Sequence, residues 1–306
     1  MMIAMMSSSL LVAAHADGDI VSRASYRLPA YDSMSPAMRR EVDHAATRAA
    51  YDSARGDARF SLERVVYTSD GLKVVAYIAP AIGRSRDARS PAIVYLRGSY
   101  VMGDEAPVLA PAMHRLAAAG YTVVAPQYRG SDGGEGRDEM GGADVHDVLN
   151  AMHLARSLPI VDSAALFLYG ESRGGMMVYQ ALRDGARVRA AAVVGAFTDL
   201  DSLLAGDARS AGAASQIWPD YAKQREQIAA RRSAIRWADS IRAPVLILHG
   251  ADDSQVSPRQ SLRMAARLGE LGRPYELHVI DGGNHTLSVR AAEREAEITA
   301  WFQRWR

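Results

Sequence analysis

The sequence predicts an α/β fold in which a mainly parallel, doubly wound sheet follows an N-terminal antiparallel hairpin. Longer helical stretches alternate with six short apolar runs, which lie at 92–96, 121–125, 165–169, 188–194, 244–248 and 275–280. Apolar runs without polar alternation are typical of parallel strands buried on both faces, which the helices between them cover. Two β-rich runs at 63–68 and 73–78 precede them, and the Asp70-Gly71 pair between these runs predicts a hairpin turn.

Composition and charge limit the classes of partner. The chain has 306 residues, of which 48% are hydrophobic, and this is enough for one sizeable core. Because 36 Lys and Arg stand against 35 Asp and Glu, we expect neither nucleic acid nor an anionic membrane surface as a partner. Beyond the N-terminus no stretch reaches the ~18 apolar residues of a membrane span. The absence of cysteine excludes disulfides, a cysteine nucleophile and thiolate metal sites.

Residues 1–16 are expected to be a signal peptide. An apolar stretch ends at Ala14-His15-Ala16, which has the small-x-small form that a signal peptidase accepts. We therefore expect export to the periplasm or the medium. No Lys or Arg precedes this stretch and three serines at 7–9 interrupt it, so the alternative is a disordered N-terminus on a cytoplasmic protein.

Residues 17–59 are predicted to form an N-terminal arm before the hairpin. Ser35 followed by Pro36 is typical of a helix N-cap and first turn, and predicts a helix from Pro36 towards Ala54. Later in the chain, the connection between 194 and 244 is longer than the others and includes a helical stretch over 220–231. Its use is either a functional loop or small cap, or ordinary packing helices.

A candidate nucleophile follows the strand predicted at 165–169. Gly170-Glu171-Ser172-Arg173-Gly174 has the pattern G-x-S-x-G, and a helical stretch begins at Met176. In this pattern glycines keep side chains out of the crowded space around a serine on a sharp, strained turn. The turn exposes Oγ and aims backbone N–H groups at a substrate carbonyl oxygen. The strand–turn–helix context favours Ser172 as a nucleophile over a chance tight turn.

A base and an acid for this serine are predicted in the loops after the last two strands. A serine needs a neighbouring base, and in this architecture the order along the chain is Ser, then Asp or Glu, then His. The strand at 244–248 leads into a loop with Asp252 and Asp253, and the strand at 275–280 ends in a Gly-rich loop with His285. His285 is the predicted base, whereas spacing alone leaves the two aspartates as alternative acids.

The other histidines are interpreted as structural or surface residues. His249 lies at a strand end, His278 lies within a strand, and four more fall on predicted helices, namely His44, His114, His146 and His153. The sequence has no H-E-x-x-H or comparable ligand cluster to support a metal mechanism. The Gly-rich run at 130–136 lacks the spacing of a dinucleotide site, so no cofactor is expected.

Four segments lie at 127–131, 170–175, 242–256 and 282–285. Together they resemble the catalytic domain of the prolyl oligopeptidase family, a group of serine peptidases with the α/β-hydrolase fold. The resemblance implies that residues 60–306 form an α/β-hydrolase catalytic domain. The family's acid is the fifth residue of a His-Gly-x-x-Asp-x-x-Val pattern, which implies Asp253 here. The resemblance also implies Ser172 as the nucleophile and His285 as the base.

Two departures from the family pattern bear on the expected activity. Many members carry a β-propeller that restricts access to small peptides, and the residues between 17 and the hairpin are too few to form one. The family often places an oxyanion-binding tyrosine where this chain has Arg97. We therefore expect the backbone N–H groups of Arg173 and Ser99 to bind the oxyanion. Arg97 and Tyr100 are predicted to line the substrate pocket.

The function that the resemblance implies is hydrolysis of a small peptide through an acyl-enzyme. Because the base must be neutral, the rate is expected to rise between about pH 6 and pH 7. The missing propeller and the altered oxyanion loop favour a carboxylesterase acting on small esters as the alternative. A non-catalytic binding protein on this fold is disfavoured, because a nucleophile, a base and an acid are all present.

Overall fold

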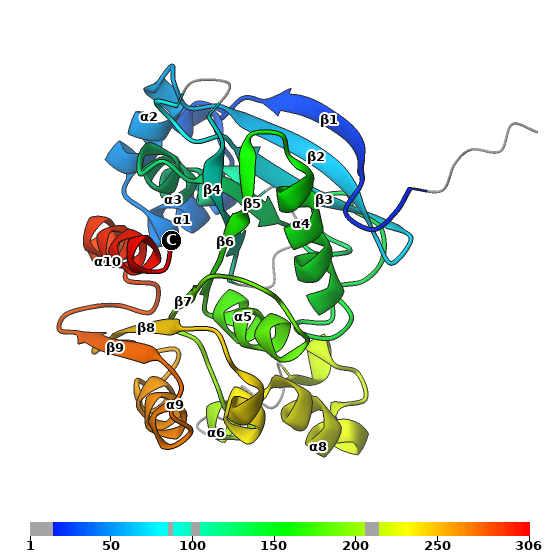
Figure 1. Ribbon diagram of the computed structural model, residues 1–306, viewed down its shortest axis with the longest axis vertical. Coiled ribbons are helices and arrows are strands. Elements are labelled where there is room, and N and C mark those ends of the chain that lie inside the picture. Colours follow the sequence, from blue (N-terminus) through cyan, green and yellow to red (C-terminus); the bar gives the residue numbers. More distant parts are fainter. Residues whose placement is uncertain (1–14, 85–87, 99–104, 206–213) are drawn as a thin grey trace, which may run out of the picture.

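The computed structural model describes residues 15–84, 88–98, 105–205 and 214–306, which form one nine-stranded sheet with helices on both faces (Figure 1). The strand order is β1-β2-β3-β5-β4-β6-β7-β8-β9. The strands are β1 (Ile20–Tyr26), β2 (Leu62–Ser69), β3 (Leu72–Ala79), β4 (Ser90–Leu96), β5 (Thr122–Pro126), β6 (Val161–Glu171), β7 (Ala191–Val194), β8 (Val245–Gly250) and β9 (Tyr275–Ile280). The first three pairs in this order are antiparallel and the others are parallel, which confirms the predicted fold class.

The predicted hairpin consists of β2 and β3. Ser69 pairs with Leu72 across a two-residue turn. Asp70 and Gly71 have φ angles of 50° and 75°, so both central residues lie in the left-handed region that a type I′ turn requires. The Asp-Gly pair therefore sets the register in which the hairpin joins the sheet.

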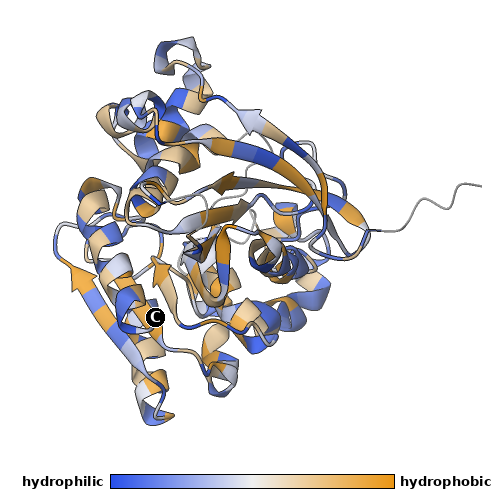
Figure 2. Ribbon diagram, turned by 45° about the horizontal axis from the view of Figure 1, so that its top comes forward, coloured by the Kyte–Doolittle hydropathy of each residue, from blue (hydrophilic) through white to orange (hydrophobic). Residues whose placement is uncertain are grey.

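Helices on the two faces bury two separate hydrophobic layers. On one face α3 (Ala106–Ala118) and α10 (Ala291–Arg304) pack on the sheet, and the Phe167 and Phe302 rings stack with centroids 4.6 Å apart. The other face carries α4 (Val145–Ser157), α5 (Arg173–Arg183) and α9 (Arg259–Glu270). Figure 2 shows hydrophobic residues along the central strands and a mixture of polar and apolar residues on the helices. Burial on both faces explains the continuous apolar runs.

The N-terminal arm differs from its prediction in two ways. The predicted single helix is two helices, α1 (Pro36–Ala45) and α2 (Arg48–Gly56), because Ala46 is extended at φ −159° and the Thr47 Oγ1 caps α2 by accepting Ala50 N–H at 3.2 Å. The arm also contributes β1, which was not predicted and which pairs with β2. A small core of Met34, Val42 and Tyr51 packs against Val108 and fixes the arm to α3.

The long connection after β7 contains α6 (Leu200–Leu204), α8 (Tyr221–Arg232) and the 3₁₀ segment Ala234–Ser240; two further 3₁₀ segments are Tyr31–Ser33 and Ser288–Arg290. Ile228 and Ala229 of α8 belong to the core that α5 covers, so this helix packs on the sheet domain. Residues 1–14 of the expected signal peptide lie outside the described residues. Among the helices that the structure describes, none has both the length and the apolar composition needed to cross a bilayer.

Candidate active site

Ser172 lies on the turn between β6 and α5, where the G-x-S-x-G pattern predicts it. Its backbone has φ 52° and ψ −119°, a strained conformation for a residue with a Cβ atom, and its N–H donates to Val194 O at 2.7 Å. Gly174 passes so close to the Leu96 and Arg97 backbone that a Cβ atom would collide with both. The glycine therefore allows α5 to start directly beneath the end of β4 and holds the serine at the carboxyl edge of the sheet.

Ser172, His285 and Asp253 form one continuous chain of hydrogen bonds. His285 Nε2 lies 2.8 Å from Ser172 Oγ, and His285 Nδ1 lies 2.7 Å from Asp253 Oδ2. Asp253 follows β8 and His285 follows β9, so three loops at the carboxyl ends of strands meet at one point. His285 is 7% exposed and Ser172 is half-buried, which leaves the serine hydroxyl open to a substrate.

Asp253, rather than its exposed neighbour Asp252, contacts the histidine. The backbone N–H groups of Gln255 and Val256 donate to Asp253 Oδ1 at 2.8 and 2.9 Å. Burial disfavours the charged carboxylate, but hydrogen bonds from histidine and from the backbone outweigh burial and hold the pKa of Asp253 well below its usual range. The carboxylate is therefore ionised and fixed where it can orient His285.

A glycine after β7 makes room for the histidine loop. Gly195 has φ +55°, and a Cβ atom there would collide with the His285 carbonyl oxygen and lie 3.2 Å from its Nδ1. A side chain at this position would displace the imidazole from Asp253. No sequence motif assigns a role to Gly195, although a glycine directly after a predicted strand is a usable signal.

Arg173, the predicted oxyanion donor, is the first residue of α5. Its backbone N–H therefore belongs to a helix N-terminus beside Ser172, where a developing negative charge is stabilised. Its guanidinium is 1% exposed and donates to Asp138 and Asp144 at 2.7 Å each. These ion pairs connect α5 to the loop between β5 and α4 (127–144), which contains the Gly-rich run and is called the Gly-rich loop below. Ser99 and Tyr100, the second predicted donor and a predicted pocket residue, lie outside the described residues.

Arg97 lines the cavity at Ser172, but its guanidinium forms hydrogen bonds with the loop after β5. Nη2 donates to Gln127 O at 2.9 Å and to Ser131 Oγ at 3.0 Å, and the side chain is 2% exposed. The guanidinium carbon also lies 4.9 Å from the centre of the Tyr128 ring. Through these hydrogen bonds and its contact with the aromatic ring, the Arg97 guanidinium stabilises the loop after β5.

A cavity of about 250 Å³ opens at Ser172 and His285. Besides the loops around the serine, two helices line it: α1 contributes Glu41, His44 and Ala45, and α3 contributes residues that include Val108. The arm therefore forms one wall of the cavity. Sequence reasoning missed these residues, because no local pattern brings a helix more than a hundred residues upstream next to the serine.

Glu171, the residue before the serine, is bound by groups from three elements. Its carboxylate accepts the hydroxyl groups of Tyr95, at 3.0 Å, and of Tyr169, and these two rings stack with centroids 4.7 Å apart. Arg294 of α10 lies 3.1 Å from the same carboxylate. Glu171 thus ties the turn before Ser172 to β4 and α10.

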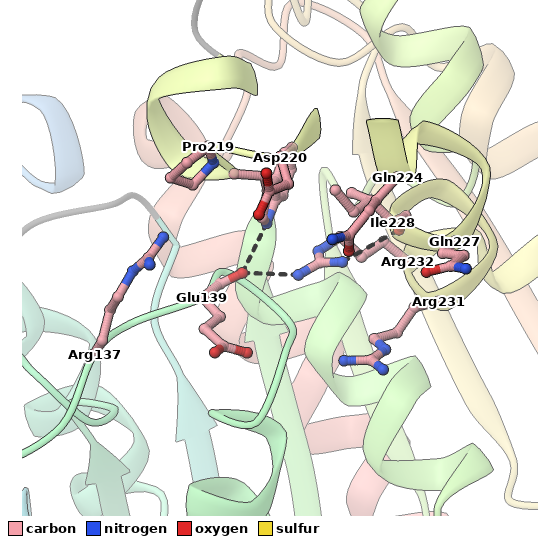
Figure 3. A pocket seen from close by; sticks show the side chains of 10 residues that line it. Arg137, Glu139, Pro219, Asp220, Gln224, Gln227, Ile228, Arg231 and Arg232 are labelled. Carbon is pink, nitrogen blue, oxygen red and sulfur yellow. Dashed lines mark hydrogen bonds between the residues drawn. The ribbon is translucent and has the colours of Figure 1, made fainter. Parts of the chain in front are cut away.

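A second cavity, of about 230 Å³, lies between α8 and the Gly-rich loop and contains none of the three hydrogen-bonded residues (Figure 3). Arg232 is buried there and donates to Glu139 O at 2.8 Å and Met140 O at 2.7 Å; burial lowers its pKa to about 10. Trp218 Nε1 donates to the same Glu139 carbonyl. These contacts attach α8 to the loop. Across the described ranges, no group of three or more His, Asp or Glu side chains is placed to hold a metal ion.

The chain matches known peptidases in sequence. Residues 109–306 match the model of the prolyl oligopeptidase family. The uncharacterized peptidase YtmA of Bacillus subtilis (strain 168) is 27% identical over 255 residues, which are 79% of this chain and 93% of that protein. The uncharacterized peptidase YuxL of the same organism is 28% identical over 200 residues, 61% of this chain but 30% of that protein.

Solved structures of peptidases share the fold. An acylaminoacyl peptidase of Pyrococcus horikoshii superposes with a TM-score of 0.68 at 20% identity, over 81% of this chain and 42% of that one. A puromycin-hydrolyzing peptidase of Mycobacterium tuberculosis gives a TM-score of 0.66 at 23% identity, over 80% of this chain and 44% of that one. The matched part of each of these solved chains is less than half of its length. The likeness in sequence and in fold identifies the α/β-hydrolase fold that the motifs predicted.

Proposed function

The chain belongs to the prolyl oligopeptidase family and is a serine hydrolase, and from this premise we propose that it cleaves short peptides with Ser172 as nucleophile, His285 as base and Asp253 as the acid that orients the base. The observation that carries this proposal is the unbroken hydrogen-bond chain from Asp253 Oδ2 through His285 to Ser172 Oγ, at 2.7 and 2.8 Å. A nucleophile, its base and an orienting carboxylate in contact are the arrangement that acyl transfer requires.

Acylation begins when His285 Nε2 removes the Ser172 hydroxyl proton as Oγ attacks the substrate carbonyl carbon. The carbonyl electron pair moves to oxygen, and the backbone N–H of Arg173 donates to the resulting oxyanion. Asp253 keeps the proton on Nδ1 and stabilises the imidazolium. When the C–N bond breaks, the departing amine takes the proton from His285 Nε2 and Ser172 carries the acyl group as an ester.

Deacylation repeats these steps with water. His285 removes a proton from water, the hydroxide oxygen attacks the ester carbonyl, and the Ser172 oxygen leaves with a proton from the imidazolium. Each turnover therefore consumes one peptide bond and one water and returns the enzyme to its starting protonation state.

The size of the cavity favours a small substrate. Its volume of about 250 Å³ is slightly below the usual range for pockets that hold drug-sized ligands, and α1 closes one side of it. A substrate residue or two next to the cleaved bond fits this space, whereas the chain of a folded protein does not. The arm thus restricts access to the cavity from that side.

Hydrolysis of blocked di- and tripeptide p-nitroanilides and of short p-nitrophenyl esters tests the proposal. Ser172→Ala is expected to abolish turnover of every substrate that the wild type cleaves, with an unchanged circular dichroism spectrum. Ser53→Ala, on the exposed side of α2, is the matched control and is expected to keep full activity. Anilide hydrolysis that persists in pure Ser172→Ala protein contradicts the assigned nucleophile.

One observation favours a second candidate, a carboxylesterase. Arg97 stands where the family often has a hydroxyl donor for the oxyanion, and its guanidinium is committed to Gln127 O and Ser131 Oγ. Losing one oxyanion donor typically raises a barrier by about 3 kcal/mol, which matters most for amides because they react more slowly than esters. Ester cleavage that depends on Ser172, without anilide cleavage, would favour this candidate.

A further inference from the structure

A second histidine shares the carboxylate oxygen that contacts His285. Asp253 Oδ2 lies 2.7 Å from His285 Nδ1 and 3.0 Å from His249 Nε2. Because the backbone donates twice to Oδ1, the Asp253 carboxylate has four donors within hydrogen-bond distance, two on each oxygen. Both the Asp253 side chain and His249 are fully buried, so no water competes with these donors.

The partners of His249 fix its tautomer. Nε2 also lies 2.8 Å from Val256 O, which only accepts, so this nitrogen carries a proton and points it towards two acceptors. Nδ1 lies 2.7 Å from Ser261 Oγ, and the hydroxyl supplies the proton that an unprotonated Nδ1 accepts. A neutral imidazole with its hydrogen on Nε2 therefore satisfies every polar neighbour.

The place of His249 in the fold makes this geometry rigid. It is the second-last residue of β8, paired with Val279 of β9, and Ser261 lies in the first turn of α9. Among the described residues, Asp253 and His285 are the titratable groups that face it through this hydrogen-bond chain, and its other contacts, Val256 O and Ser261, are neutral. Strand, loop and helix thus hold one N–H against the carboxylate.

We propose that His249 is a positioning residue that sets the pH at which His285 becomes a neutral base, by donating a hydrogen bond to the same Asp253 oxygen. The inference rests on the triad of the proposed function. When a carboxylate accepts an additional hydrogen bond, its negative charge stabilises a neighbouring imidazolium less. The His249 donor therefore weakens the attraction of Asp253 for the proton on His285 and extends activity towards lower pH.

Two amide substitutions separate this role from packing. The Gln amide nitrogen reaches the position of the imidazole Nε2, whereas the shorter Asn amide reaches only the position of Nδ1, beside Ser261. His249→Asn is expected to shift the acidic limb of the pH profile of kcat/KM to higher pH, by about half a unit to one unit. His249→Gln is expected to restore the wild-type limb. KM on the plateau is expected to stay unchanged in both variants, because His249 does not touch the cavity.

A matched control is available at another histidine–aspartate contact. His114 Nε2 lies 3.0 Å from Asp57 Oδ2 between α3 and the arm, outside the cavity. His114→Asn is expected to change the unfolding midpoint without moving the limb. If His249→Asn moves the limb no further than His114→Asn does, or if His249→Gln behaves like His249→Asn, the positioning role is wrong.

Imidazole nitrogen NMR on the wild-type chain gives a readout that does not depend on a folded variant. His249 is expected to keep its Nε2–H tautomer between about pH 5 and pH 8 while His285 titrates. A His249 ring that titrates, or that carries its proton on Nδ1, overturns the inference. Activity that survives in Ser172→Ala overturns the proposed function and this inference together, whereas an unmoved limb with Ser172-dependent activity overturns this inference alone.

Discussion

Arg294 of α10 forms a buried ion pair with Glu171, with 3.1 Å between Nη1 and Oε1. The same Nη1 donates to Thr286 O at 2.5 Å. Glu171 precedes the proposed nucleophile Ser172 and Thr286 follows the proposed base His285, so one guanidinium on α10 holds together the two loops that carry them. Arg294 is 2% exposed, so water screens these contacts little.

Replacing Arg294 is therefore expected to affect both stability and activity. Arg294→Met leaves the Glu171 carboxylate buried without its cation, and breaking a buried pair in this way typically costs about 3–5 kcal/mol of unfolding free energy. Because the loops separate, kcat is expected to fall even at temperatures where the variant remains folded. Urea unfolding and steady-state kinetics on the same preparation measure the two effects.

Arg290→Met is the matched control for this prediction. Arg290 lies just before α10, is exposed, and has its own carboxylate neighbour in Glu293 at 3.5 Å. Exposed pairs contribute little, so this variant is expected to keep the wild-type stability within about 1 kcal/mol, together with full activity. Equal losses in the two variants would show that Arg294 has no special role in joining the loops.

The parts of the site that sequence predicts are those with a local pattern. Ser172 lies in a five-residue motif between a strand and a helix, and His285 follows the last strand, so each is recognisable from its neighbours. Spacing did not separate Asp253 from Asp252, and the family pattern was needed. The hydrogen bond to His285 distinguishes them in three dimensions, because Asp253 points inward and Asp252 is exposed.

The parts that sequence does not predict depend on contacts between distant segments. Nothing in the local sequence distinguishes Arg294 from other charged residues of a helix. Only the packing of α10 brings it to Glu171. The arm was predicted to contain one helix, because Ser35 and Pro36 mark a single helix start, but the Thr47 cap starts a second one. The place of α1 at the cavity follows from its packing on α3, which leaves no sign in the local sequence.

Asp144 is predicted to make stability depend on pH. Burial disfavours its charge, but Arg173 and the backbone N–H groups of Gly141 and Gly142 outweigh burial and lower its pKa. A carboxyl group with a lowered folded pKa contributes stability above its unfolded pKa, near 3.9, and this contribution is lost as the pH falls through the folded value. The unfolding free energy of Asp144→Asn is therefore expected to fall less than that of the wild type between pH 7 and about pH 3.

Urea titrations at the two pH values measure this difference. Asp252→Asn provides the control, because Asp252 is exposed, and its pH dependence is expected to match the wild type. An Asp144→Asn variant with the full wild-type loss on acidification would show that the Arg173 pair does not contribute to acid sensitivity.

The wall that α1 forms is predicted to limit substrate size. Ala45 lines the cavity at Ser172 and is half-buried, so Ala45→Phe places a ring in space that a longer substrate would occupy. We expect kcat/KM for a blocked tripeptide anilide to fall by about tenfold or more, whereas hydrolysis of p-nitrophenyl acetate, whose acyl group is only two carbons long, is expected to change little. Ala37→Phe on the same helix is exposed and does not line the cavity, so it controls for the effect of the ring on α1 itself. Equal losses for the long and short substrates in Ala45→Phe would indicate a displaced arm, whereas a loss confined to the tripeptide would identify α1 as part of the substrate site.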